Sequence, residues 1–567
     1  MSFSPRITSL LAVGSFLTFF LACQAADQPV YQPCPLIRAY YPAPTIDKSS
    51  DLIKSFSQNF SAVFDNLIKT GNHEIYGEIT PNTTSFSVVL FSTADDGHDD
   101  PIFFDYHHTA PAAKAKKNVG LDTVFPIGSL TQLFTVYAWL AKFGDKEWDT
   151  PITKFIPELL NAKGPTSKDD VKNEFTVPWS DVTIGALASH MAGVARDSNA
   201  CQLGKACDKK HFVDTFAQVP PVSLPDMTPI FSNAGFQLLA LAVETPNGPG
   251  PKGATSYDEV LRKTILGPLN MTHTRLAGDK GVDSSTIFGG GLNTSAPGEQ
   301  GSLSILSTTS DLARLGHSIL SSSLLPPATT RRWFTPAAST SNLRNSVGRP
   351  WEIYHASFSS ASPSPIADIF LKSGEVASYS SYLGLSPDLS VGFAILAHDS
   401  SLGNKPADLN VYADVVAETL ADIFGLAARG AMARFGGSFS GVANNMNTSV
   451  EFEISADGPG LVVSNMVIDG KDVRAEMANQ AGIETKNLDF RVYPAIEAAG
   501  KYQFVAVYQD KNAPVDAGTP TCITWMTVGQ LGGGAVDRVV FELDKDGVAT
   551  GVSIPSRGIT MTMDKKA

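Results

Sequence analysis

The pattern of hydrophobic and polar positions predicts a mixed helix and strand region in the first three quarters of the chain. Over residues 52–68 apolar side chains recur every three or four positions, which is typical of an amphipathic helix. Residues 85–91 and 102–106 are rich in β-branched and aromatic side chains and are expected to form strands. Helical periodicity returns directly after Ser129 and again from Asn233.

Three strand-like segments follow closely on one another later in this region. They are IADIFLKSG, ASYSSYLGL and VGFAILAH, and turn residues separate them. Such spacing predicts an antiparallel meander. A helix is expected after the meander, from residue 410 to about residue 426, with Gly430 a little beyond its end.

The pattern changes after about residue 430, where short β-like stretches recur at close intervals between Gly, Asp and Asn residues. The stretches are VEFEI, LVVSNMVI, DFRVYPAI, YQFVAVY, CITWMTV, RVVFEL, TGVSI and ITMTM. Regularly spaced short strands of this kind predict an all-β barrel or sandwich of about eight strands. A length of 567 residues also favours more than one domain.

The first residues predict a cleaved secretory signal. Arg6 precedes an apolar run at 10–22, and the small residues that signal peptidase needs follow it. The run is short for a bilayer-spanning helix, and no later segment is long and apolar enough to take that role. We therefore expect a secreted protein with a signal peptide at 1–25, a first domain at 26–430 and an all-β domain at 431–567.

Cysteine and asparagine positions agree with secretion. Four cysteines remain after signal cleavage and allow three pairings. A local bridge across the short loop between Cys201 and Cys207 is plausible, and Cys34 would then pair with Cys522. Five sequons are typical of a glycoprotein. They begin at Asn59, Asn82, Asn270, Asn293 and Asn447.

Charge and motifs narrow the range of partners. The net charge of −13 is spread along the chain and no basic run is present, so a nucleic-acid partner is not expected. No His/Cys cluster has metal-ligand spacing, and there is neither a P-loop nor a G-x-G-x-x-G segment after a strand. We expect no metal, no cofactor and no membrane, but a small-molecule substrate or ligand. The pattern does not determine the oligomeric state.

The segment FPIGSLTQLF around Ser129 carries the strongest chemical signal. A serine at the start of a helix benefits from the helix dipole and from free backbone N–H groups that bind an oxyanion. The residue three positions further on lies on the same helix face, one turn away. A lysine there would accept the serine proton, but this chain has Gln132.

Six motifs together resemble the serine β-lactamase and penicillin-binding-protein family, in its class C and esterase-like branch. The chain is most similar to secreted fungal β-lactamase-like proteins that carry an added C-terminal β domain. The motifs, in chain order, are SLTQ at 129–132, LASHMAG at 187–193, FSN at 231–233, ILGPLNMTHT at 265–274, STTSDLAR at 307–314 and KSG at 372–374. The resemblance implies an α+β fold, in which helices and a helical subdomain flank an antiparallel sheet.

In that family the lysine of S-x-x-K and the tyrosine of Y-x-N activate the serine nucleophile. Ser129 takes the nucleophile position here, whereas Gln132 and Phe231 replace the two activating residues. The resemblance leaves Asn233 and Lys372 as further catalytic candidates. His190, which could also act as a base, looks structural in relatives.

By the same analogy the backbone N–H groups of Ser129 and Glu375 form the oxyanion hole. Glu375 follows the K-S-G motif directly, so its charge weakens the attraction of Lys372 for a substrate carboxylate. This predicts that β-lactams, which carry such a carboxylate, are not substrates.

Three functions are compatible with the sequence. The first is a serine hydrolase or acyl-transfer protein with an altered catalytic centre, which acts on a small ester, amide or thioester. The second is a non-hydrolytic descendant that binds a small molecule or assists a rearrangement or cyclisation in secondary metabolism. The third is a binding module without catalysis, led by the β domain.

Overall fold

The computed structural model describes most of the chain, and the chain separates into two compact units. The described residues are 34, 36, 40–93, 100–115, 117–161, 175–244, 256–279, 287–290, 292–357, 366–401, 408–455, 458–512, 524–526 and 538–564. Residues 43–358 and 366–427 form the large unit, and residues 1–42, 359–365 and 428–567 form the C-terminal unit. The predicted signal peptide and Cys522 lie outside the described residues.

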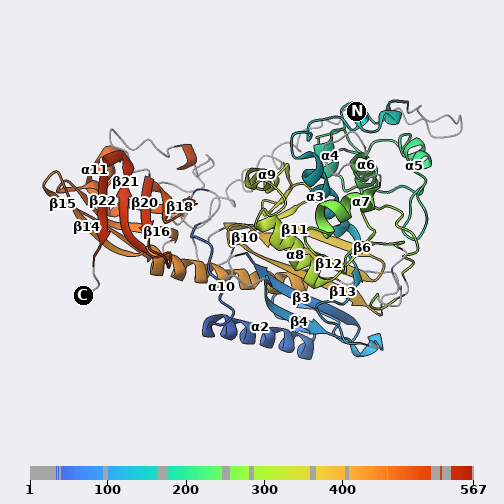
Figure 1. The fold of residues 1–567 in the computed structure, drawn as a ribbon, viewed down its shortest axis with the longest axis horizontal. Helices are drawn as coiled ribbons and strands as arrows, with labels where there is room; N and C mark the ends of the chain where they lie inside the picture. Colours follow the sequence, from blue (N-terminus) through green and yellow to red (C-terminus); the bar gives the residue numbers. More distant parts are fainter. Residues whose placement is uncertain are drawn as a thin grey trace, which may run out of the picture. The chain divides into compact units, whose positions relative to one another are not determined.

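An antiparallel sheet of eight strands forms the centre of the large unit (Figure 1). The strand order is β4-β3-β13-β12-β11-β10-β9-β8, and the predicted meander supplies β11, β12 and β13. The neighbouring strands β3 and β13 are buried along their whole length, as expected for strands covered on both faces. The strands are β3 (Thr84–Ser92), β4 (Ile102–His108), β8 (Ala338–Ser339), β9 (Asn345–Val347), β10 (Glu352–Ser357), β11 (Ile366–Val376), β12 (Tyr379–Ser386) and β13 (Val391–Asp399).

Helices cover both faces of this sheet. Consecutive residues of a strand point to opposite faces, so neighbouring residues of β3 contact different helices. Phe86 of β3 packs against Phe64 of α2 (Asp51–Thr70). Its neighbour Ser87 contacts Thr309 of α8 (Thr309–Leu320) at 2.8 Å. The helices α2 and α8 therefore lie on opposite faces, as Figure 1 shows.

A helical subdomain lies on the α8 side of the sheet. Its two central helices, α3 (Thr131–Phe143) and α6 (Asn233–Val243), pack against each other and are buried on nearly all sides. A three-stranded sheet leads into this region, with β5 (Phe125–Pro126), β6 (Arg275–Leu276) and β7 (Ile305–Ser307). Further helices of the large unit are α4 (Ile184–Ala188), α5 (Lys209–Phe216), α7 (Tyr257–Leu261) and α9 (Pro327–Trp333).

The C-terminal unit is a closed antiparallel sheet. Strand β15 pairs with both β14 and β16, so the sheet closes on itself as a barrel, and β17 extends it beside β16. Phe435, Phe439, Phe504 and Phe541 pack together inside it. The strands are β14 (Gly437–Ala443), β15 (Met446–Ser455), β16 (Gly458–Ile468), β17 (Lys471–Asp472), β18 (Leu488–Ala498), β19 (Lys501–Asp510), β20 (Arg538–Leu543), β21 (Ala549–Ile554) and β22 (Ile559–Met563).

Three local predictions need correction. Helix α10 runs from Asn410 to Phe435 and does not end near residue 426. Gly430 costs only about 1 kcal/mol within a helix, and the buried side chains of Ala427, Ala431 and Phe435 continue the apolar face past it. The predicted strand at 522–528 contains the 3-10 turn Thr524–Met526, and α11 (Val473–Ala481) is a helix that was not predicted.

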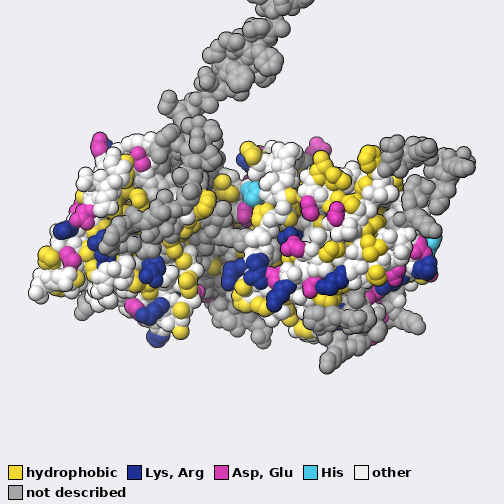
Figure 2. Space-filling view, turned by 90° about the horizontal axis from the view of Figure 1, so that it is seen from above, with side chains coloured by type: hydrophobic (Ala, Val, Ile, Leu, Met, Phe, Trp, Pro, Cys, Tyr) yellow, Lys and Arg dark blue, Asp and Glu magenta, His cyan; other side chains and the backbone are white. Residues whose placement is uncertain are grey.

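The fold class of both regions agrees with the sequence, as a mixed helix and sheet domain followed by a separate β-rich domain. Among the described residues, no helix has the length and apolar character required to cross a bilayer. On the face shown in Figure 2, acidic side chains lie scattered among basic and polar ones. The negative charge is therefore not gathered into one patch on that face.

Candidate active site

The structure places Ser129 in a tight turn that rests on strand β11. Ser129 is the middle residue of the 3-10 turn Gly128–Leu130, directly before α3. Gly128 has a φ of 51°, and a Cβ on this residue would stand 2.5 Å from the Glu375 carbonyl oxygen. A Cβ on Gly374 would meet Leu130 N at 2.5 Å. The turn can approach β11 this closely only because both positions are glycine. The turn and β11 are therefore in backbone contact.

The edge of β11 beside the turn has main-chain donors that point outward. Strand β10 pairs with β11 only as far as Leu371, through Glu352. The Ser373 N–H donates to Glu352 Oε2 at 3.0 Å on that side. Alternate N–H groups of a strand point to the same edge, so the Glu375 N–H points there too. The two predicted oxyanion donors, Ser129 and Glu375, thus lie on backbone segments that contact each other.

The Ser129 hydroxyl has no hydrogen-bonding partner among the described residues, and Ser129 is 9% exposed. Gln132, one turn further along α3, is fully buried. Its Nε2 donates to Asn233 Oδ1 at 3.1 Å and to Ser302 Oγ at 2.9 Å. Its Oε1 has no partner within the described part of the chain. The amide therefore occupies the lysine position without a basic atom.

Asn233 connects this amide to two residues that no motif indicated. Its Oδ1 also accepts from Ser302 Oγ at 2.6 Å, and its Nδ2 donates to Asp197 Oδ1 at 2.7 Å. Ser302 and Asp197 lie in loops without periodicity, so the sequence gives no signal for them. The network orients Asn233 completely.

Phe231 occupies the tyrosine position and contacts two neighbouring side chains. The His190 ring stacks on it with centroids 4.6 Å apart, and the Arg196 guanidinium is 4.7 Å from its centroid. The Lys372 ammonium is 5.6 Å from the same ring. An aromatic ring can attract these cations but cannot exchange a proton with Ser129.

His190 is held by the start of α6 and is not a base at neutral pH. Its Nδ1 accepts the Ser232 N–H at 3.1 Å. Burial, assisted by the charges of Lys372 and Arg196, lowers the pKa of His190 to about 3. Ser232 itself caps α6 through Gly235 N at 2.8 Å and so sets the register of Asn233.

Lys372 is 1% exposed and its ammonium is already paired. Lys372 Nζ donates to Glu352 Oε1 at 2.5 Å and to the Ser373 carbonyl oxygen at 2.8 Å. Glu375, two positions beyond Ser373, is exposed. The cation that would attract a substrate carboxylate is therefore already neutralised by Glu352.

Glu299 is a further acidic group of this region that sequence reasoning missed. It is 4% exposed, and burial together with the charge of Asp197 raises its pKa to about 8, against a weaker opposite effect of the Ser198 backbone N–H. Its backbone oxygen accepts the Ser302 N–H at 3.0 Å. A lone glutamate in a loop gives no sequence signal of this kind.

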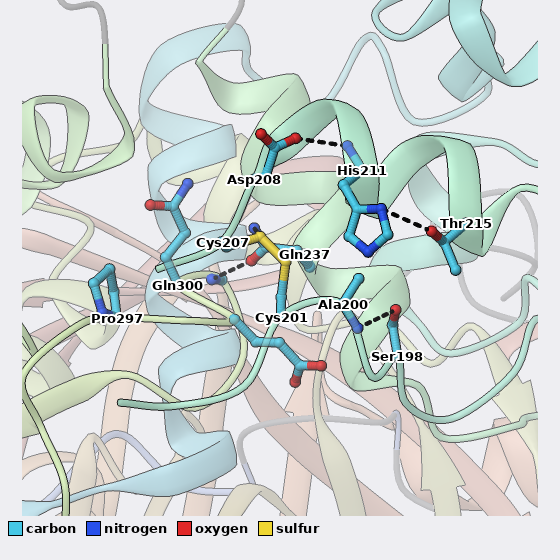
Figure 3. Close-up of a disulfide and its surroundings, with 12 residues drawn as sticks. Ser198, Ala200, Cys201, Cys207, Asp208, His211, Thr215, Gln237, Pro297 and Gln300 are labelled. Carbon is cyan, nitrogen blue, oxygen red and sulfur yellow. Dashed lines mark hydrogen bonds between the residues drawn. A yellow bond between two sulfur atoms is a disulfide. The ribbon is translucent and has the colours of Figure 1, made fainter. Parts of the chain in front are cut away.

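A disulfide between Cys201 and Cys207 holds the loop beside this segment (Figure 3). The loop's Gly204 N–H donates to the Ala296 carbonyl oxygen at 2.9 Å. Gln237 of α6, labelled beside the disulfide in Figure 3, accepts the Gly301 N–H at 3.3 Å. The bridged loop and α6 thus support the segment that carries Glu299 and Ser302.

The other predicted covalent sites can be placed only in part. Cys34 is disulfide-bonded, and its carbonyl oxygen accepts from Thr524 Oγ1 at 2.7 Å. Its predicted partner Cys522 lies outside the described residues. All five sequon asparagines are exposed, at Asn59, Asn82, Asn270, Asn293 and Asn447.

The fold agrees with what comparison with known proteins shows. Residues 93–418 match the family described as Beta-lactamase, which is more than half of the chain. The chain therefore belongs to the β-lactamase family. Residues 427–565 match the family described as Beta-lactamase-like-like, C-terminal domain.

One relative matches nearly the whole chain. It is a Beta-lactamase-like protein of Arthroderma benhamiae, 23% identical over 587 aligned positions, which cover 91% of this chain and 93% of the relative. Among solved structures, a β-lactamase/D-alanine carboxypeptidase from Yersinia pestis is 16% identical, with a TM-score of 0.48, and covers 66% of this chain and 99% of its own. A class C β-lactamase from Rhodobacter sphaeroides is 17% identical, with a TM-score of 0.46, over 65% and 99%.

Proposed function

We propose that the protein is a secreted serine acyl-transfer enzyme or hydrolase with an altered catalytic centre, acting on a small ester, amide or thioester. The observation that carries the proposal is the Ser129 turn. Two glycines, Gly128 and Gly374, bring that turn into backbone contact with β11. This contact supports an oxyanion hole made by the backbone N–H groups of Ser129 and Glu375.

The route of the serine proton differs from that of the family. Gln132 and Phe231 carry no basic atom, and the pKa of His190 is too low for it to take a proton at neutral pH. A positioned base contributes about 10²–10⁴-fold to a rate, so hydrolysis is expected to be slower by that factor. Such a site favours acyl donors whose leaving group needs no protonation, namely activated esters and thioesters.

β-Lactams are poor candidates for the substrate. The Lys372 ammonium is paired with Glu352 at 2.5 Å, and Glu375 is exposed at the same strand edge. A substrate carboxylate would meet a neutralised cation and an additional negative charge there. Rapid turnover of nitrocefin by the purified protein, lost in Ser129→Ala, would contradict this part of the proposal.

A serine-directed fluorophosphonate tests the nucleophile directly. The purified protein is treated with the probe, and intact mass and peptide mapping locate the adduct. We expect slow labelling of Ser129 that is absent in Ser129→Ala. The double variant Gln132→Lys with Phe231→Tyr restores both basic positions and is expected to label at least about 10²-fold faster.

A non-hydrolytic role is the second candidate, and the buried amide network favours it. Gln132, Asn233 and Ser302 are linked by hydrogen bonds, and the buried Gln132 Oε1 has no partner among the described residues, so the site can orient a ligand without exchanging protons. In this case the protein binds a small molecule or assists a rearrangement. No Ser129 adduct in the native protein, with an adduct in the double variant, would favour this function over the first.

Secretion and glycosylation belong to the same proposal. Production in a eukaryotic host is expected to give a chain that begins after about residue 25 and loses mass on treatment with an N-glycosidase. An intracellular product with an intact N-terminus would contradict the secreted assignment. A role led by the C-terminal unit would instead show as a biological effect that disappears when residues beyond about 430 are removed, while Ser129 labelling persists.

A further inference from the structure

A second group of serine, histidine and aspartate side chains lies on β9, β10 and β11, away from Ser129. Ser346 Oγ is 3.0 Å from His355 Nε2, and His355 Nδ1 is 2.6 Å from Asp368 Oδ1. Sheet register explains the group, because His355 lies opposite Asp368. Asp368 is six residues from Gly374 along β11, which is roughly 20 Å at the rise of a strand.

The three side chains are arranged as a catalytic triad requires. The hydroxyl contacts Nε2, and the carboxylate contacts Nδ1 of the same imidazole. A carboxylate in this position holds the Nδ1–H tautomer, which leaves Nε2 free to accept the serine proton. Triads are recognised by these roles and by geometry, and the order of residues in the chain does not matter.

The group is also partly accessible. Ser346 is 8% exposed, and the side chains of His355 and Asp368 are 25% and 18% exposed. Within the described part of the chain, the Ser346 hydroxyl has His355 as its only hydrogen-bonding partner. Nothing among these residues therefore competes with the imidazole for the hydroxyl proton.

A similar group elsewhere in the sheet shows which features matter. Ser87 Oγ is 2.9 Å from His107 Nδ1, and His107 Nε2 is 3.0 Å from Asp105 Oδ2. There the two ring nitrogens are exchanged, Ser87 is completely buried, and its hydroxyl also contacts Thr309 at 2.8 Å. Ser87 cannot meet a substrate, and the group connects β3, β4 and α8.

We propose that Ser346 is a second nucleophile, activated by His355 and Asp368, which accepts the acyl group of a small ester. His355 Nε2 takes the hydroxyl proton while Ser346 Oγ bonds to the carbonyl carbon. The ester C–O bond then breaks, and the leaving alkoxide takes the proton from His355 and departs as an alcohol. Water then attacks the acyl carbonyl carbon while His355 Nε2 takes a proton from it. The acyl–Oγ bond breaks, His355 returns the proton to Ser346 Oγ, and the carboxylic acid leaves.

The test uses the full chain with Ser129→Ala, so that only other serines can react. The protein is treated with p-nitrophenyl acetate or a fluorophosphonate, and peptide mapping locates the adduct. We expect an adduct on Ser346 that Ser346→Ala abolishes. Ser339→Ala is the matched control, because Ser339 lies opposite Ser346 on β8 and is exposed, and within the described part of the chain it has no hydrogen bond to a histidine. It is expected to leave the adduct unchanged.

His355→Ala separates an activating role from a structural one. The rate of Ser346 labelling is expected to fall by about 10²-fold or more, and added imidazole is expected to restore part of it. Imidazole would not restore a packing defect. Absence of a Ser346 adduct in the folded Ser129→Ala protein would overturn the proposal. A labelling rate that His355→Ala leaves unchanged would also overturn it. Neither outcome affects the Ser129 proposal, because the test uses the Ser129→Ala protein and peptide mapping assigns each adduct to its own serine.

Discussion

Replacement of Glu299 by glutamine is expected to change how the stability of the large unit depends on pH. Glu299 is 4% exposed and the pKa of its carboxyl is raised from 4.5 to about 8, mainly by burial and secondly by Asp197. The folded protein therefore keeps the Glu299 proton over a pH range in which the unfolded chain has released it. Unfolding in that range releases a proton, so stability falls as pH rises.

The size of the effect follows from the two pKa values. Below about pH 4.5 both states hold the proton and its contribution to stability is complete. Between pH 4.5 and 8 the loss is at most about 1.4 kcal/mol per pH unit, and on the order of 5 kcal/mol in total. Above pH 8 the folded state also ionises and the loss stops growing. Glu299→Gln has no proton to lose at this position. Its free energy of unfolding, relative to that of the native protein, is therefore expected to rise with pH through this range.

Denaturant unfolding of both proteins at several pH values between 4 and 9 measures this difference. Glu375→Gln is the matched control, because Glu375 is exposed, and its curve is expected to stay parallel to that of the native protein. If the Glu299→Gln and native curves also ran parallel, burial would not hold the proton on Glu299 and the reasoning would fail.

Three further perturbations have expected outcomes from the same contacts. Replacement of Cys201 and Cys207 by serine removes a short bridged loop and is expected to cost about 2 kcal/mol in the free energy of unfolding, measured by thermal or chemical unfolding with a reduced sample as control. Gly374→Ala inserts a Cβ against the backbone of the serine turn and is expected to lower both stability and Ser129 labelling, whereas unchanged labelling would show that this contact is unnecessary. Glu352→Ala leaves Lys372 as an unpaired buried cation and is expected to cost about 2–3 kcal/mol, less than for a fully buried pair because Glu352 is 43% exposed; a stability loss below about 0.5 kcal/mol would contradict this.

Residues whose motif falls on a strongly periodic element could be located from the sequence. Ser129 precedes α3, Asn233 begins α6 and Lys372 lies on a strand of the predicted meander, so periodicity and motif agree at each of them. The fold class of both regions was predicted from the same agreement between periodicity and motifs. The roles of these residues in catalysis stay predictions.

The surroundings of those residues could not be predicted. Glu352 reaches Lys372 only because sheet register places β10 beside β11. Asp197, Glu299 and Ser302 lie in loops, whose path depends on tertiary contacts that no local pattern encodes. Helix α11 was missed because it is short, with buried residues over little more than one turn.

The bond between the Glu352 carboxylate and the Ser373 N–H has a consequence for the kind of molecule that the protein can accept. An extended peptide binds to the edge of a sheet by pairing its main chain with outward-pointing donors and acceptors. At this edge the first donor is already occupied by a side chain at 3.0 Å. A peptide that docked here as an additional strand would have to displace Glu352 and expose the charge of Lys372. The same contact protects the edge from pairing with another chain, so it favours compact acyl donors over polypeptides.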